Sequence, residues 1–193
     1  MPPRFVLASG SPRRRQLLSE AGFQFEVLTL PVEEVAHDWL TIRELTMWNA
    51  GRKAAQVSEK SPNAVVLAAD TLVTIDNTVL GKPSDLDDAV RILRRLSGRS
   101  HEVWTAVTIS HAARARSESF HEMSRVYFRN LDGRAIRNYL AKIDPLDKAG
   151  AYAAQGFGTE IIDRIEGSYS NVVGLPMEKT TAVLQIFGVT PAA

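Results

Sequence analysis

Unbroken apolar runs and segments of alternating polarity mark the predicted strands of this chain. "NAVVLAAD", residues 63–70, is apolar from Ala64 to Ala69, which is typical of a buried central strand. Residues 5–8 form a shorter run of the same kind. Apolar and polar residues alternate over 23–30, 101–110 and 118–130, which predicts further strands, and "EIIDRIEGSYSNVVGLP" is interpreted as strand and loop.

Other segments place their apolar residues at helical spacing. The first predicted helix has Ser11 as N-cap, Pro12 at its first position and Gly22 as its stop. A later one has Ser84 as N-cap and Gly98 after its end. The remaining predicted helices cover residues 41–58, 132–143 and 177–187, and residues 71–83 predict a hairpin turning at Asp76 and Asn77.

Strands that alternate with helices predict an α/β protein. The 193 residues, 45% hydrophobic, suit one globular domain or two joined lobes, and no linker marks a boundary. A net charge of +1 gives no global field for nucleic acid or anionic membranes. The absence of cysteine excludes disulfides and thiol chemistry, and no segment reads as a signal peptide or a membrane span. We therefore expect a soluble cytoplasmic protein.

The first turn of the first predicted helix carries an unusual concentration of positive charge. Arg13, Arg14 and Arg15 lie where the helix dipole disfavours cations. Free backbone N–H groups at a helix start bind anions, and a guanidinium group can bind two phosphate oxygens through two parallel N–H groups. The turn therefore predicts a phosphate site at Arg13 and Arg14, with Arg15 in solvent. The alternative is that all three arginines form a solvated face.

Carboxylates at two places in the sequence could orient a water molecule or bind a metal ion. Asp70 follows the most apolar run, and ligands of open α/β sheets bind beyond the carboxyl ends of strands. It could orient a water molecule or hold Mg²⁺, or it could be an ordinary turn residue. Glu33 and Glu34 could add oxygen ligands, or they could lie in a solvated loop.

Lys53, Lys82 and Gln155 are weaker candidates. Each lysine could neutralise phosphate or be an ordinary surface residue. Gln155 lies in the glycine-containing segment "DKAGAYAAQGFG" and offers a donor and an acceptor to a base edge, unless that segment is only a flexible loop. The histidines lack metal-ligand spacing, and no nucleophile elbow or Walker signature occurs, so covalent catalysis is not favoured.

Several segments, taken in order, resemble the Maf family of nucleoside triphosphate pyrophosphatases. They are "LASGSPRRRQLL", "AADTLV", "LGKPSD", "LRRLSGRSHEVWTAV", "DKAGAYAAQG" and "GSYSNVVGLP", and they span essentially the whole chain. The resemblance implies one Maf-like domain over residues 1–193, with two lobes whose boundary the sequence does not assign. It further implies a curved mixed sheet, flanking helices, a deep central cleft as in inosine triphosphate pyrophosphatases, and a homodimer.

The resemblance also implies a reaction and a set of roles. The family cleaves nucleoside triphosphates between the α and β phosphates with a divalent metal, Mg²⁺ or Mn²⁺. By position, Asp70 resembles the family's proton acceptor. Glu33 or Glu34, together with Asp70, resembles the residues associated with the metal. Residues similar to the phosphate-binding set are Ser9, Arg13, Arg14, Lys53 and Lys82. Residues similar to those tied to nucleotide choice are Arg13, Thr71 and Gln155.

The loop "DKAGAYAAQG" resembles the branch that acts on dTTP and UTP. It departs from that branch at Ala153 and Ala154, where glycine and isoleucine are common, so the loop geometry is restricted differently. The alternatives are the branch acting on methylated GTP and a regulator of cell division that binds nucleotides without hydrolysing them. An RNA-binding protein is the least favoured interpretation, because the chain is only 7% aromatic and nearly neutral.

Overall fold

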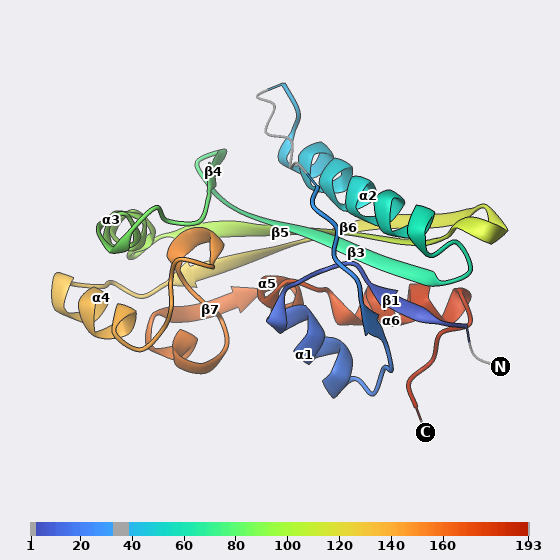
Figure 1. The fold of residues 1–193 in the computed structure, drawn as a ribbon. Coiled ribbons are helices and arrows are strands. Elements are labelled where there is room, and N and C mark those ends of the chain that lie inside the picture. The colour runs from blue at the N-terminus through green and yellow to red at the C-terminus, as the bar shows by residue number, and fades with distance from the viewer. Residues whose placement is uncertain (1–2, 33–38, 193) are drawn as a thin grey trace. The chain divides into compact units, whose positions relative to one another are not determined.

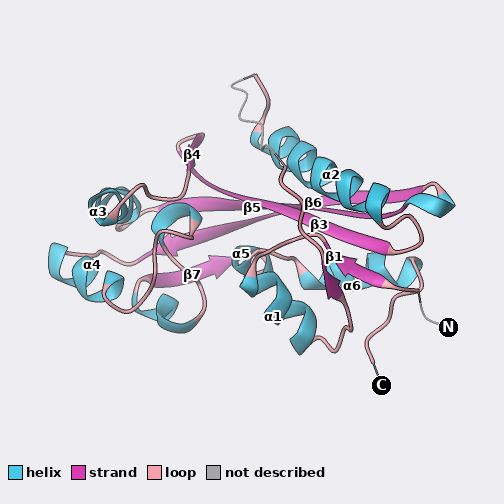
Figure 2. Ribbon diagram, in the orientation of Figure 1, coloured by secondary structure: helices cyan, strands magenta, loops and turns pink. Residues whose placement is uncertain are grey.

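The computed structural model describes residues 3–32 and 39–192, and the chain divides into two compact units (Figures 1 and 2). Unit 1 contains the residues up to Thr71, Thr105–Glu122 and the residues from Gly174 onward. Unit 2 contains Leu72–Trp104 and Met123–Val173. In the part of the chain that the structure describes, no helix is long and apolar enough to cross a membrane.

The elements follow one another in mixed α/β order. They are β1 (Phe5–Leu7), α1 (Pro12–Glu20), β2 (Glu26–Val27), α2 (Ile42–Lys60), β3 (Val65–Ile75), β4 (Thr78–Leu80), α3 (Leu86–Leu96), β5 (Ser100–His111), η1 (Ala112–Arg114), β6 (Arg116–Phe128), α4 (Gly133–Leu140), η2 (Ala149–Ala151), η3 (Gly156–Glu160), β7 (Ile162–Glu166), α5 (Tyr169–Val173) and α6 (Met177–Ile186).

The strands form one seven-stranded mixed sheet. Its order is β2-β1-β3-β5-β6-β7, with β4 paired to β3. β1 runs parallel to β2 and β3, whereas the pairs β3–β4 and β6–β7 are antiparallel. The predicted α/β class with a mixed sheet and flanking helices is therefore confirmed. The single domain and the central cleft stay predictions.

In unit 1, successive side chains of β1 and β3 enter different hydrophobic cores, because side chains alternate along a strand. Leu7, Leu67 and Ala69 join a cluster with residues of α1 and α6. Val66 and Ala68 join a separate cluster with Ala54 and Val57 of α2. Figure 1 shows α2 on one face of these strands and α1 and α6 on the other. Unit 1 therefore has a helix layer on each face of its strands.

The predicted helix starts are confirmed except at α3. The Ser11 hydroxyl accepts the N–H of Arg14, and Thr41 forms a capping box with Glu44 at the start of α2. At α3 the predicted cap, Ser84, is wrong. Asp85 caps the helix instead, because its carboxylate accepts the N–H of Asp88 at 2.7 Å.

Local signals predicted some strand ends and missed others. The hairpin between β3 and β4 turns at Asp76 and Asn77, whose φ values of 52° and 57° are those of a tight hairpin turn. The apolar strand predicted up to Asp70 and the first arm of the predicted hairpin are one continuous strand, β3, which ends at Ile75. β2 is only two residues long, and the segment predicted as a loop after β7 contains α5.

Buried aromatic side chains hold the segment that contains η2 within unit 2. Tyr152 packs edge-on against Phe128 and His101, and its hydroxyl lies 2.8 Å from Nε2 of His101. The Tyr139 hydroxyl accepts the N–H of Ala153 at 3.0 Å and donates to the carbonyl of the same residue at 3.3 Å. These bonds fix the backbone two residues before Gln155.

Tyr139→Phe is expected to lower the free energy of unfolding by about 1–3 kcal/mol, because the N–H of the half-buried Ala153 then loses its partner beside the buried Tyr139 ring. Urea denaturation measures this change. Tyr127→Phe is the matched control, since its hydroxyl bonds the exposed Glu166 and its loss should cost only about 0.5 kcal/mol. Equal losses in the two variants would contradict the role given to Tyr139.

Candidate active site in unit 1

The candidate site lies where β1 leaves the sheet and β3 continues without β1 beside it. The parallel pairing of β1 with β3 ends at Leu7 and Leu67, and one further bond joins the Ala8 N–H to the Leu67 carbonyl at 2.7 Å. The chain then passes through Ser9 and Gly10 into α1. Backbone groups of β3 beyond Leu67 therefore need partners other than β1 on this edge.

Asp70 faces α2 from this open part of β3. Its side chain follows Val66 and Ala68 on the same face of the strand. The side chain is only 7% exposed, and its Oδ1 accepts a hydrogen bond from Nζ of Lys53 on α2 at 2.7 Å. Among the described residues, the buried Oδ2 has no hydrogen-bond partner. Asp70 therefore offers one oxygen that is free to accept a proton or bind a cation.

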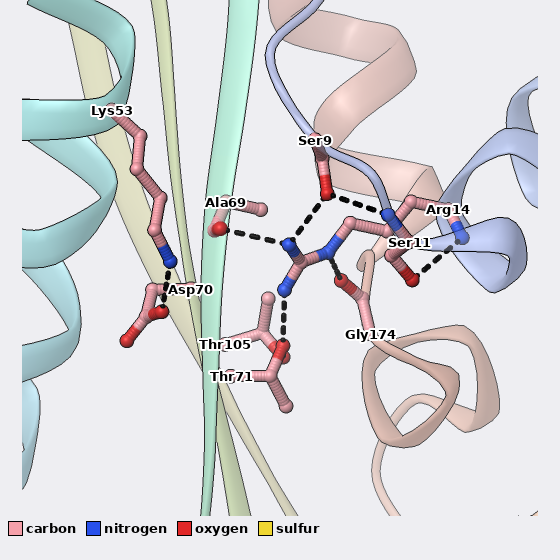
Figure 3. Close-up of polar contacts among 9 residues, drawn as sticks. All are labelled: Ser9, Ser11, Arg14, Lys53, Ala69, Asp70, Thr71, Thr105 and Gly174. Atoms are coloured by element: carbon pink, nitrogen blue, oxygen red, sulfur yellow. Dashed lines mark hydrogen bonds and ion pairs between the residues drawn. The ribbon is translucent and has the colours of Figure 1, made fainter. Parts of the chain in front are cut away.

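Arg14 lies on the opposite face of β3 (Figure 3). Its Nε donates to the carbonyl of Gly174 at 2.8 Å. Its Nη1 donates to the Ala69 carbonyl at 2.9 Å and to Oγ of Ser9 at 3.0 Å. Its Nη2 donates to Oγ1 of Thr71 at 2.9 Å. Protein oxygens from distant parts of the chain therefore surround the guanidinium.

The Ser9 hydroxyl is held as a hydrogen-bond donor. Its Oγ accepts from Arg14 Nη1 and from the backbone N–H of Ser11 at 3.3 Å. A hydroxyl has two lone pairs and one proton, so these two bonds leave only the proton for a further partner. Ser9 can therefore donate to an oxyanion near the start of α1, where the helix dipole also favours negative charge.

The other predicted residues have different places. Arg13 is half-buried in the first turn of α1, and Arg15 is exposed, as expected. Glu33 and Glu34 lie outside the described residues. In unit 2, Lys82 is exposed in the loop after β4, and Gln155 is half-buried between η2 and η3.

The structure thus brings together some of the predicted residues in unit 1: Ser9, Arg14, Lys53, Asp70 and Thr71. Lys53 contacts Asp70, and its predicted phosphate contact stays a prediction.

Sequence reasoning missed two residues at the site. Thr105 of β5 places its Oγ1 3.0 Å from Oγ1 of Thr71, and Gly174 supplies a carbonyl to Arg14. The φ of Gly174 is +125°, a conformation that favours glycine. The glycine in "VVGLP" was a visible signal for a special backbone position, but a threonine in an alternating strand gave none.

The open oxygen of Asp70 fits a divalent metal. Mg²⁺ in nucleotide sites is usually bound by one or two carboxylates together with substrate phosphates. Within the described ranges, no group of three or more His, Cys, Asp or Glu residues could hold a metal ion. Oδ2 of Asp70 has the chemistry of one such ligand, and further ligands would come from beyond the described side chains.

Comparison with known proteins gives consistent matches over nearly the whole chain. The family model described as "Maf-like protein" matches residues 4–187. A protein of Pelotomaculum thermopropionicum named "dTTP/UTP pyrophosphatase" is 45% identical over 183 residues, covering 95% of this chain and 96% of the relative. One of Bacillus pumilus with the same name is 42% identical, covering 97% and 98%. The solved structure of the Staphylococcus aureus Ham1 protein aligns with a TM-score of 0.51 at 16% identity, covering 95% of this chain and 97% of that one, which shows a shared fold.

Proposed function

The chain belongs to the Maf family, and we propose that it hydrolyses the α–β phosphoanhydride of dTTP and UTP, releasing the nucleoside monophosphate and pyrophosphate. The observation that carries the proposal is the buried Asp70, whose Oδ1 is fixed by Lys53 and whose Oδ2 is open among the described residues. A buried polar atom without a partner is costly to keep, and such atoms are concentrated at functional sites.

Asp70 acts as the general base. Oδ2 takes a proton from a water molecule while the water oxygen bonds to the α-phosphorus. The bond from the α-phosphorus to the bridging oxygen breaks, and this oxygen leaves with pyrophosphate and keeps the electron pair. The hydrogen bond from Lys53 holds the carboxylate in one orientation. Reactions of this kind depend mainly on position and charge neutralisation.

Positive groups and one hydroxyl bind the phosphates. Arg13 and the backbone N–H groups in the first turn of α1 bind the negatively charged phosphate oxygens. The Ser9 hydroxyl donates a hydrogen bond to one of these oxygens. Lys82 and Gln155 contribute phosphate and base contacts, and Thr71 takes part in nucleotide choice. For these three residues, the resemblance to the family is the support.

A divalent cation, Mg²⁺ or Mn²⁺, belongs to the proposal. Asp70 and Glu33 or Glu34 would hold it, and when bound it neutralises charge on the phosphates. A homodimer and a cytoplasmic location are also proposed. The family resemblance supports the dimer, and the absence of cysteine fits a reducing compartment.

A panel of nucleoside triphosphates tests the proposed function. With Mg²⁺ or Mn²⁺, we expect pyrophosphate from dTTP and UTP, little from purine nucleotides, and no matching orthophosphate. Pyrophosphate chiefly from methylated GTP would reassign the substrate. Saturable binding of nucleotides without pyrophosphate would contradict an enzyme and favour a regulator.

A further inference from the structure

We propose that Arg14 is a positioning residue that holds Asp70 from the opposite face of β3, rather than a ligand of the phosphates. The inference rests on the proposed function, because it assigns Arg14 a role in the reaction of Asp70. It depends on the partners of the guanidinium, on the open edge of β3 and on the alternation of side chains along that strand.

The hydrogen-bonding capacity of Arg14 is largely taken up by the protein. A guanidinium has five N–H donors, and four of these contact protein oxygens at 2.8–3.0 Å. A bidentate phosphate contact needs a pair of free, parallel N–H groups. Arg14 could form such a contact only by giving up bonds to partners that are themselves buried or half-buried.

Two of these bonds are made to the residues on either side of Asp70. Nη1 binds the carbonyl of Ala69, and Nη2 binds the hydroxyl of Thr71. Because β1 leaves the sheet after Leu7, the Ala69 carbonyl receives its hydrogen bond from Arg14. The guanidinium thus fixes the backbone at the residue that carries the carboxylate.

Arg14 and the Asp70 carboxylate lie on different faces of β3. The face of Leu67 and Ala69 packs toward α1, whereas Asp70 pairs with Lys53 on α2. Figure 3 shows the strand between the two groups. Arg14 therefore affects the reaction through the backbone of β3. Its loss should reduce turnover much more than nucleotide binding.

Arg14→Lys is the decisive variant, since lysine keeps the charge but cannot reproduce the planar set of donors. We expect kcat for dTTP to fall by about 10–100-fold, the size of effect produced by small displacements of a catalytic group. Binding is measured separately in the Asp70→Asn background, where turnover is slow. There, Arg14→Lys should change the Kd of dTTP with Mg²⁺ by less than about threefold, whereas loss of a charged phosphate contact would raise it about 10–100-fold.

A double-mutant comparison separates positioning from a general structural effect. If Arg14 acts through Asp70, Arg14→Lys should have little further effect on the residual rate of Asp70→Asn. Arg15→Lys is the matched control, because Arg15 is exposed in the same turn of α1 and its replacement should leave kcat and Kd unchanged. The proposal would be overturned if Arg14→Lys left kcat unchanged or raised Kd strongly. It would also be overturned if Arg14→Lys reduced the rate of Asp70→Asn as much as it reduces the rate of the wild type.

Two further outcomes are distinguishable. Urea denaturation shows whether Arg14→Lys is folded. If it is not, the same measurements are made on Arg14→Gln, which buries no unpaired charge, and the expected results are the same. If the wild-type chain releases no pyrophosphate from any nucleotide, the proposed function fails and the role of Arg14 fails with it. An active wild type with a binding defect in the Arg14 variants overturns only the role of Arg14.

Discussion

Asp70→Asn is expected to lower the turnover of dTTP by about 10²–10⁴-fold, the usual contribution of a general base. Asparagine has nearly the same shape, so it should keep the packing against α2, but its amide cannot take a proton from water at neutral pH. Its side-chain oxygen can still accept the hydrogen bond from Lys53. We therefore expect nucleotide binding to remain measurable. Pyrophosphate release and equilibrium binding of dTTP check the two parts of this prediction.

Asp76→Asn is the matched control for Asp70→Asn. Asp76 is exposed in the hairpin between β3 and β4 and pairs with Arg99 at the surface, so its replacement should leave turnover unchanged. Full activity in Asp70→Asn would remove Asp70 from the mechanism. An equal loss in both variants would point to a general effect of lost negative charge.

The parts of the fold that depend on local signals could be predicted from the sequence. The start of α1 follows from Ser11 and Pro12, and the hairpin follows from Asp76 and Asn77. Local signals did not show that the apolar run and the first arm of this hairpin form one strand, β3. Asp70 breaks the apolar run, yet the strand continues because β4 and β5 pair with it, and those partners lie outside any local window.

At the site, too, features that depend on neighbouring residues could be predicted, whereas contacts between distant residues could not. Asp70 stands out because a carboxylate directly after six apolar residues needs an explanation. The surroundings of Arg14 do not stand out, because its partners Ala69 and Gly174 lie 55 and 160 residues away in the chain. The sequence indicated a phosphate site for Arg13 and Arg14 alike, although the structure surrounds the Arg14 guanidinium with protein oxygens.

Acidification below pH 6.5 is expected to destabilise the protein through His101. The imidazole is 2% exposed and packs against Phe128 and Tyr152, and burial lowers its pKa from 6.5 to about 4. Between these values the unfolded chain binds a proton that the folded chain does not, so stability rises with pH across this window. The contribution is fully present above pH 6.5 and is lost as the pH falls toward 4. The shift corresponds to about 3 kcal/mol.

Urea denaturation at several pH values between 4 and 7 measures this loss, with His101→Phe as the comparison variant. The variant should be less stable at neutral pH, because the buried Tyr152 hydroxyl loses its bond to Nε2. It has no imidazole to protonate at this site, so the stability gap between the two proteins should narrow as the pH falls. The protonated ring would carry a proton on both nitrogens, and Nδ1 is buried without a hydrogen-bond partner among the described residues. Parallel pH curves would show that His101 titrates alike in the folded and unfolded chains, contrary to its burial among aromatic rings.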